Sequence, residues 1–453
     1  MKKCLFILLI FFVKLAQAQE PKGLSLEEAI QIGLENNPII HISEMSVQYA
    51  EARAREAGTT LLPSLRVDGS YHRLSDVPEF TLDVPFPDMT ADGIEIFPNI
   101  VDHYTARISL QQPLFTGFRL QGNRDALKYT AKAERHSHRA DKNELEYAII
   151  KAYWNAYRAR EAKHVVTASI EQLQEHLHNV ENFYEEGLVT RNEVLKVRVQ
   201  LSNMNVRLIE AGNNVRVAMV RLNNLIGLPL HSDIELTSEP QCELTNSQDI
   251  DDYITTAVGD NPEILELESR KQAGASALRV ARSGWYPQIY LSGGYYYQRP
   301  HQRYLPLRDE FNDSWDIGIT LSLDVWNWGA TSHRTSQARA QLRQTEYALE
   351  KRRDDISVAV MQEYLNVESA REQVEAAKIA MEQAKENYRV TSDLFKEDMV
   401  VNADVLNADV ALLQAHINYI EALVKYEIAQ AGLRKSIGNY ECNHSKKFNQ
   451  KVR

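Results

Sequence analysis

The chain has 453 residues, 44% of them hydrophobic and 25% charged, a balance that is typical of folded proteins and excludes a disordered one. The formal net charge is −11, and without Lys2, Lys3 and Lys14 at the amino terminus it is 48 − 62 = −14. This sign argues against nucleic acid as a partner. Beyond the amino terminus no run approaches the roughly 18 unbroken apolar residues of a membrane-spanning helix, which excludes a polytopic helical membrane protein.

Residues 1–18 have the pattern of a secretory signal peptide. A basic start at Lys2 and Lys3 precedes an apolar run, and Ala16-Gln17-Ala18 has the small-x-small pattern of a cleavage site. The apolar run is too short to anchor the chain in a bilayer. We therefore expect cleavage after Ala18 and export of the remaining chain.

The exported chain is a tandem repeat of one unit. Asn37-Pro38 matches Asn261-Pro262 at an offset of 224 residues, and Val194-Leu195 matches Val405-Leu406 at an offset of 211. The difference falls in one proline-rich loop, from about His72 to Tyr104 in the first copy, which we interpret as an exposed tip. The predicted organisation is a signal peptide (1–18), repeat 1 (19–230), a linker (231–247), repeat 2 (248–438) and a C-terminal tail (439–453).

Four segments of about ten residues alternate between apolar and polar side chains, which predicts strands with one wet face. The alternation is clearest where Trp315, Ile317 and Ile319 interleave with Asp316 and Gly318. Tilted strands of this length cross an outer membrane, and a soluble sandwich is the alternative. The predicted strands span about residues 63–72, 105–115, 287–297 and 314–325.

Four strands cannot close a barrel alone, and unpaired strand edges are not tolerated in lipid. The chain is therefore expected to oligomerise. A dimer supplies eight strands, which fill their own interior, whereas a trimer supplies twelve and leaves a lumen for the polar faces. We expect a membrane α+β fold in which three chains form a 12-stranded β-barrel.

The rest of each copy is predicted to be helical, because glycine and proline are absent from Asn123 to Glu186 and from Ala330 to Ala431. In each copy a long helix and a shorter returning helix form a hairpin, at about residues 118–227 and 330–437. The returning helices carry an apolar heptad, which predicts a coiled-coil seam. The seam residues are Val194, Val197, Leu201, Met204, Leu208, Ala211, Val215, Ala218, Leu222 and Leu225, and in the second copy Val405, Ala408, Leu412, Ala415, Tyr419, Ala422, Tyr426, Ala429 and Leu433.

The helices of each hairpin are expected to turn back at residues 186–193 and 397–404. Gly187 supplies a positive backbone angle in the first turn, whereas the second turn has Asp398 in place of glycine. The side-chain oxygens of Thr190, Asn192 and Asn402 are candidates for capping the returning helices.

With these features in this order, the sequence resembles the TolC-type outer-membrane efflux proteins over nearly all of residues 24–438. Each motif is weak alone, and their order makes the resemblance specific. The motifs are Leu24-Ser25-Leu26-Glu27-Glu28-Ala29 before Asn37-Pro38, Gln112-Pro113-Leu114-Phe115-Thr116-Gly117, Gly187-Leu188 with Glu193-Val194-Leu195, and Asp404-Val405-Leu406.

The resemblance implies a homotrimer in the outer membrane of a Gram-negative bacterium, with its barrel in contact with outer-membrane lipid and continuous with a long helical coiled-coil tunnel through the periplasm. It implies a passive export duct, neither an enzyme nor a cofactor-binding protein. A periplasmic membrane-fusion (adaptor) protein would connect it to an inner-membrane pump of RND, ABC or MFS type, which supplies the energy for efflux or type I secretion. The residues that match the adaptor-docking tips are Gly187, Leu188, Val189, Asp398, Met399 and Val400.

The resemblance also places a periplasmic gate on the returning helix of the second copy, where the family often has the sequence Asp-Val-Leu-Asp. Here the sequence is Asp404-Val405-Leu406-Asn407. One ring of carboxylates and one ring of amides would line the closed end, so we expect weaker cation binding than with two carboxylate rings. A solvated helix cap is the alternative role for Asp404.

Nothing in the sequence points to catalysis or to a metal site, because the common nucleotide-binding, zinc-hydrolase and serine-hydrolase motifs are absent. The pairs His136/His138 and His176/His178 lie on different sides of a helix at a spacing of two, so we interpret them as structural.

Cys242 and Cys442 each follow the end of a repeat, and they either pair in an oxidising compartment or remain free thiols. The alternative function for the whole chain is a secreted, soluble coiled-coil adhesion or scaffold protein. In that case the four strands would belong to a small sandwich and would need no detergent.

Overall fold

The computed structural model describes residues 22–77, 80–82, 94–97, 99–241, 249–305 and 307–438. The predicted signal peptide and C-terminal tail lie outside these residues, as do Cys242 and Cys442. In chain order the elements are β1 (Lys22–Leu24), α2 (Leu26–Asn36), α3 (Pro38–Thr59), β2 (Ser64–Arg73), β3 (Phe80–Leu82), β4 (Ile94–Phe97), β5 (Asp102–Phe115), α4 (Arg119–Glu185), α5 (Arg191–Leu225), β6 (Ile234–Leu236), α6 (Ile250–Asp260), α7 (Pro262–Arg282), the 3-10 helix η1 (Ser283–Trp285), β7 (Gln288–Arg299), β8 (Asn312–Ser322), α8 (Ala330–Lys396) and α9 (Asn402–Ile437).

The described residues divide into two compact units, and each unit takes part of both sequence copies. Unit 1 comprises the residues up to Met45, His136–Leu265 and those from Glu350 onward. Unit 2 comprises Ser46–Arg135 and Glu266–Leu349. Neither compact unit therefore coincides with one predicted repeat, because each contains segments of both repeats.

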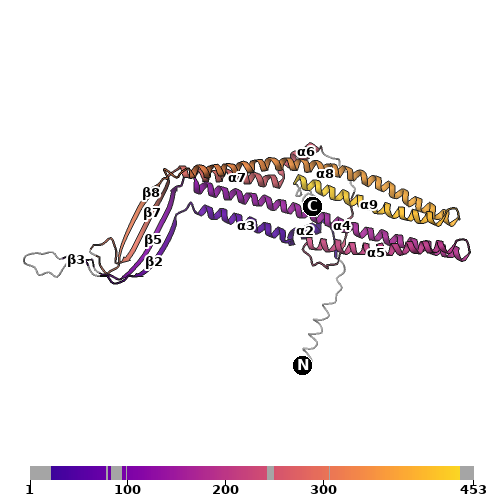
Figure 1. Cartoon of the computed structure of the whole chain (residues 1–453), viewed down its shortest axis with the longest axis horizontal. Coiled ribbons are helices and arrows are strands. Elements are labelled where there is room, and N and C mark those ends of the chain that lie inside the picture. The colour runs from indigo at the N-terminus through magenta and orange to yellow at the C-terminus, as the bar shows by residue number, and fades with distance from the viewer. Residues whose placement is uncertain are drawn as a thin grey trace, which may run out of the picture. The chain divides into compact units, whose positions relative to one another are not determined.

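Unit 2 contains an antiparallel sheet of four strands in the order β2-β5-β7-β8 (Figure 1). β5 of the first copy pairs with β7 of the second at the centre, with Ile108 opposite Tyr295. β2 and β8 are the outer strands, and each pairs on one side only within the described chain. The expected alternation of apolar and polar residues is therefore found in long strands, as predicted from their period of two.

Two short pairs of strands were not predicted. β3 and β4 form an antiparallel pair within the segment between His72 and Tyr104, which was expected to be a loop. β1 pairs in parallel with β6, with Lys22 opposite Ile234. β6 lies inside the segment 231–247, which was expected to be a linker. Pairs of three or four residues are too short to produce a recognisable period in the sequence.

In unit 1, one asparagine in each copy connects two helices by the same hydrogen bonds. Asn37 Nδ2 donates to the carbonyl oxygen of Leu225 at 2.8 Å, and its Oδ1 accepts from Ile39 N–H. Asn261 Nδ2 donates to Ser436 O at 3.0 Å, and its Oδ1 accepts from the N–H two residues later. Each side chain thus caps the start of one helix and binds the end of another, which explains the Asn-Pro repeat in physical terms.

The hydrophobic core of unit 1 packs around α4 near the β1–β6 pair. Tyr153 is fully buried there, and its hydroxyl donates to Leu24 O and accepts from Ser238 N–H, both at 2.9 Å. Trp154 packs edge to face on Tyr153 with ring centroids 5.5 Å apart. The short strands are therefore anchored to the long helix by one buried phenol.

The turns of both helical hairpins lie in unit 1. There α5 returns along α4, and α9 returns along α8 (Figure 1). Every residue of the predicted heptad seams is buried or half-buried. Val197 and Met204 on α5 are fully buried, and Val405 on α9 is nearly so. The seam prediction is confirmed because a 3-4 spacing keeps one stripe of each helix toward its neighbours.

Candidate functional site

The four-stranded sheet has one apolar and one polar face, and neither is covered by a second sheet among the described residues. Cross-strand pairing places Val67, Ile108, Tyr295 and Trp315 in one row across the sheet. The next row carries polar side chains, and includes Asp68 and Arg107 in register. The exposed residues of the apolar face are Leu65, Val67, Tyr71, Tyr104, Ile108, Leu110, Tyr295, Tyr297, Trp315, Ile317, Ile319 and Leu321.

A soluble protein rarely exposes so large a continuous apolar surface. The soluble-sandwich alternative predicts a second sheet packed on this face, and the described residues contain none. The sheet is instead built to separate lipid on one side from water on the other.

The two hairpin turns have the same backbone geometry although their sequences differ. In the first turn, Gly187 N–H donates to Tyr184 O at 3.0 Å and Leu188 N–H to Phe183 O at 2.8 Å. In the second, Asp398 and Met399 donate to the carbonyls of Phe395 and Leu394 at 3.1 and 2.9 Å. Gly187 has φ of 76° and Asp398 of 56°, so aspartate adopts the left-handed conformation that glycine provides in the first copy.

A small hydrophobic core holds the two turns together. Val180, Val194 and Val197 from the first hairpin pack with Phe395 and Val405 from the second. The partly buried Val189 and Val400 of the predicted docking tips close this core, whereas Leu188 and Met399 are 63% and 70% exposed. The structure thus separates the six predicted tip residues into those that support the turns and those that project from them.

The prediction that Thr190, Asn192 or Asn402 caps a returning helix was wrong. Thr190 is the N-cap of α5 but makes no side-chain cap bond. Asn402 is buried, and its Nδ2 donates to Glu193 Oε2 at 3.0 Å and to Glu193 O at 3.3 Å. Its Oδ1 lies 2.7 Å from Nε2 of His176 on α4. Because the amide nitrogen faces Glu193, the oxygen accepts from the histidine.

Burial and hydrogen bonds set the protonation states of the residues in this contact between the hairpins. Burial lowers the pKa of His176, so the ring stays neutral near pH 7 and its Nε2 hydrogen is the donor. Hydrogen bonds from Lys196 and then from Asn402 lower the pKa of Glu193, which keeps this carboxylate ionised. His176 was predicted only to be structural, because a single histidine and a single asparagine far apart in the chain give no signal that they meet.

The predicted gate residues Asp404 and Asn407 are both exposed, one turn apart on α9. A carboxylate oxygen of Asp404 accepts from Val401 N–H at 3.3 Å, so the residue also acts as the helix cap that was its alternative role. Asn407 faces the same side because residues three apart lie on one face of a helix. Both side chains therefore remain available to line a surface beyond this single chain.

A buried acid that sequence analysis missed lies farther along the same helix. Asp409 is 2% exposed, and its oxygens accept from Ser169 Oγ of α4 at 3.3 and 3.2 Å. Burial raises the pKa of Asp409 to about 6. Burial, and next the charge of Asp409, raise the pKa of Tyr388 on α8 to about 12. The helices of both hairpins thus meet around one ionisable carboxyl group.

Two kinds of feature are absent from the part of the chain that the structure describes. No group of three or more histidine, cysteine, aspartate or glutamate side chains is arranged to hold a metal ion. No described helix combines the length and apolar character needed to cross a membrane.

Comparison with known proteins agrees with this geometry. The outer membrane efflux protein family matches residues 29–228 and 253–439. The alkaline protease secretion protein AprF of Pseudomonas aeruginosa is 24% identical over 420 residues, which cover 91% of this chain and 84% of that protein. The outer membrane protein TolC of Escherichia coli is 21% identical over 453 residues, which cover 97% and 87%.

The fold is shared with solved channels. The outer membrane protein VceC of Vibrio cholerae superposes with a TM-score of 0.74 at 17% identity, over 91% of this chain and 96% of VceC. The family match supports the channel interpretation and not the soluble scaffold alternative. The chain belongs to the outer membrane efflux protein family, and it is a channel component of the outer membrane that extends into the periplasm and has no enzymatic role.

Proposed function

We propose that three copies of this chain assemble into one export duct that is open to the cell exterior through the sheet and gated at the hairpin tips. The observation that carries this proposal is the sheet with one lipid-compatible face, one polar face and two unpaired edges. In lipid, each backbone N–H and C=O group needs a partner, so β2 of one copy pairs with β8 of the next.

The number of chains in the assembly follows from the size of the lumen. Each copy contributes the four strands of unit 2, and three copies give twelve. The polar face then lines a water-filled passage, because a barrel of this size is wider than its own inward side chains fill. Cargo crosses this passage without chemical change, and an inner-membrane pump provides the energy.

We assign the gate to Asp404 and Asn407. Both are exposed in the single chain and lie on one face of α9, close to the turn that ends the hairpin. In a symmetric trimer this face repeats around the axis, so the carboxylates form one ring and the amides a second ring. Cations are attracted to the carboxylate ring, and the amide ring adds no charge.

Single-channel recording in planar bilayers tests this assignment. A multivalent cation added on the side of the tips is expected to block the wild-type channel, and Asp404→Asn to weaken that block. Asp251→Asn is the matched control, because Asp251 is an exposed acid at the start of α6 and outside both hairpins. Equal block of all three proteins would contradict the gate.

We assign adaptor docking to the turns that contain Gly187, Leu188, Val189, Asp398, Met399 and Val400. The exposed Leu188 and Met399 offer apolar contacts, and the shared turn geometry lets one adaptor motif bind both copies. Leu188→Asp with Met399→Asp is expected to abolish export in cells while the trimer persists. Leu305→Asp, an exposed leucine of the β7–β8 loop, is expected to leave export unchanged. Normal export by the double variant would contradict docking at the tips.

A further inference from the structure

A hollow in unit 2 lies where the helices meet the sheet, and neither the gate nor the docking tips use it. It has a volume of about 400 Å³ and is formed by the end of α7, by η1 and by the first turns of α8. Its wall contains two arginines, Arg282 and Arg339, and two aromatic rings, Trp285 and Tyr286. The wall of the hollow thus combines positive charge with aromatic surface.

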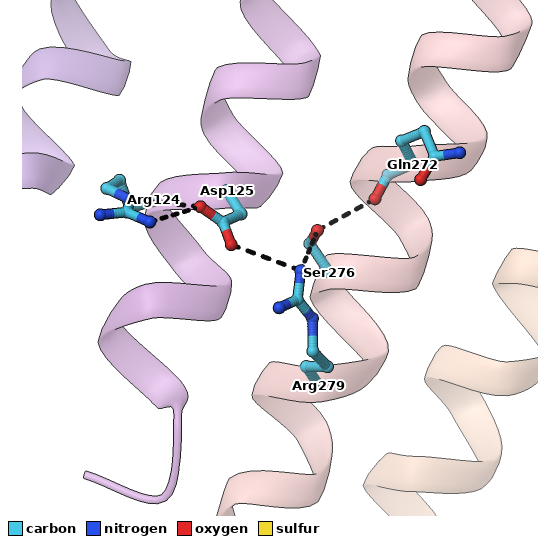
Figure 2. A network of polar contacts seen from close by, with 5 residues as sticks. All are labelled: Arg124, Asp125, Gln272, Ser276 and Arg279. Carbon is cyan, nitrogen blue, oxygen red and sulfur yellow. Dashed lines mark hydrogen bonds and ion pairs between the residues drawn. The ribbon is translucent and has the colours of Figure 1, made fainter. Parts of the chain in front are cut away.

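The two arginines carry charge that no described acid neutralises. Within the described part of the chain, neither guanidinium of Arg282 or Arg339 makes an ion pair or a hydrogen bond. Arg279, one turn earlier on α7, differs, because it donates to Asp125 Oδ2 at 3.4 Å and to Ser276 Oγ at 3.1 Å (Figure 2). The acid of this neighbouring network is therefore already engaged, and the two guanidiniums of the hollow remain free to bind an anion.

Hydroxyl groups complete a set of donors for phosphate. Ser332 and Ser336 contribute exposed hydroxyls to the wall from one side of α8, four residues apart. Thr335 also lines the wall, but its hydroxyl already donates to Thr331 O at 2.8 Å. Guanidinium groups bind phosphate oxygens through paired N–H donors, and hydroxyls satisfy the remaining lone pairs. The donor set fits a phosphate better than it fits a carboxylate, which has fewer oxygens to satisfy.

The aromatic wall lies on the lipid side of the sheet. The ring of Tyr286 packs edge to face against Phe115 and Phe118, with centroids 6.5 and 6.1 Å apart. Phe115 pairs with Ile289, which belongs to the apolar face. The aromatic wall of the hollow is therefore continuous with the apolar face of the sheet.

Its depth in the membrane follows from the neighbouring aromatic residues. Trp326 and Trp328, just after β8, are 75% and 86% exposed, and Trp285 is 58% exposed. Exposed tryptophans at strand ends occupy the headgroup level of a bilayer. Because the helices extend into the periplasm, this level belongs to the periplasmic leaflet of the outer membrane.

We propose that the hollow binds the headgroup phosphate of an anionic glycerophospholipid from the periplasmic leaflet. Arg282 and Arg339 bind the phosphate, and the rings of Trp285 and Tyr286 cover the glycerol and the first carbons of the acyl chains. A basic pocket beside apolar surface is a known arrangement for lipid headgroups. The bound lipid fixes the depth at which the sheet sits.

Native mass spectrometry of the detergent-solubilised full-length assembly, titrated with phosphatidylglycerol, tests the proposal. Arg282→Gln with Arg339→Gln is expected to weaken phosphatidylglycerol binding at least tenfold, because both charge-assisted contacts with the phosphate are lost. Arg334→Gln is the matched control, since Arg334 is exposed on α8 and outside the hollow. Both single variants are expected to show intermediate losses, and they replace the double variant if it fails to assemble.

Two results would overturn the proposal. One is equal phosphatidylglycerol occupancy in the double variant and in the Arg334→Gln control. The other concerns the source of the phosphate, and uses inorganic phosphate as the probe. If millimolar inorganic phosphate displaces the lipid and protects the protein equally well against heating, the hollow is a free-anion site and the lipid assignment is wrong.

Discussion

Replacing Asp409 by asparagine is expected to stabilise the packing of the two hairpins at neutral pH. The carboxyl group is buried, and Ser169 Oγ is its hydrogen-bond donor in the described chain. Burial raises its pKa from the usual 3.8 to about 6, so the ionised form is disfavoured in the folded protein. Asparagine has nearly the same shape and carries no charge.

The magnitude follows from the two pKa values. A difference of about two pH units corresponds to about 3 kcal/mol at pH values above 6, at 1.36 kcal/mol per pH unit. The buried NH₂ group of asparagine lacks an acceptor and costs about 1 kcal/mol. The variant is therefore expected to gain about 2 kcal/mol, which lowers the population of locally opened α9 about 30-fold.

The sign of the pH dependence is fixed by the same linkage. Because the folded pKa is raised, the folded state binds more protons than the open state between pH 3.8 and about 6. The wild-type penalty therefore grows as the pH rises through this window, and the advantage of Asp409→Asn disappears by about pH 4. Tyr388 stays neutral throughout, since its pKa is about 12. Burial, and next the charge of Lys385, lower the pKa of His416, and Asp409 does not contribute to this shift, so His416 is expected to titrate alike in both proteins.

Hydrogen exchange measured by mass spectrometry on peptides that cover the first half of α9 is the assay. Wild type and Asp409→Asn are compared at about pH 7.5 and about pH 4, each pair at one pH. Glu421→Gln, at an exposed acid on the same helix and away from its cap, is the control and is expected to leave exchange around Asp409 unchanged. Equal or faster exchange in Asp409→Asn at pH 7.5, or a difference that does not change with pH, would refute the reasoning.

Three further predictions concern the tips. Asn402→Ala removes the contact with His176 and leaves that buried ring without its acceptor, which costs about 1–3 kcal/mol; limited proteolysis at the turns should become faster, and unchanged cleavage would exclude a role in joining the hairpins. Asp398→Gly relieves a left-handed conformation and should stabilise the second turn by up to about 1 kcal/mol, whereas Gly187→Ala should destabilise the first by about 1–2 kcal/mol; thermal unfolding followed by circular dichroism checks both, and shifts of the same sign would contradict the shared geometry. Asn407→Asp adds a second carboxylate ring and should strengthen cation block in single-channel recordings, and an unchanged block would place this residue away from the axis.

The long elements could be predicted because their signals are periodic and uninterrupted. Residues Trp315 to Leu321 alternate strictly, and α8 contains neither glycine nor proline, so few other structures fit either segment. The position of the second turn was also predictable, although Asp398 hides the glycine signal, because it aligns with Gly187 in the other copy. The internal duplication thus supplied a signal for the second turn that the sequence of that turn alone lacks.

The contacts between the hairpins could not be predicted, because they depend on tertiary packing. A heptad describes one stripe, yet α9 buries Ala408 with Asp409 and Leu412 with Leu413, since it packs against more than one neighbouring helix. The second stripe makes Asp409 buried although the seam pattern leaves it outside. Asn402 similarly looked like a cap because it precedes a helix, and only the fold brings it to His176.

The mass of the detergent-solubilised mature protein, measured by light scattering with the detergent contribution subtracted, tests the central claim most directly. The full chain is 51.8 kDa, and three chains without their signal peptides are expected in each particle. Circular dichroism of the same sample should show helix together with strand. A particle of one or two chains that is stable without detergent would supply too few strands for a wide barrel, and would contradict the trimeric duct.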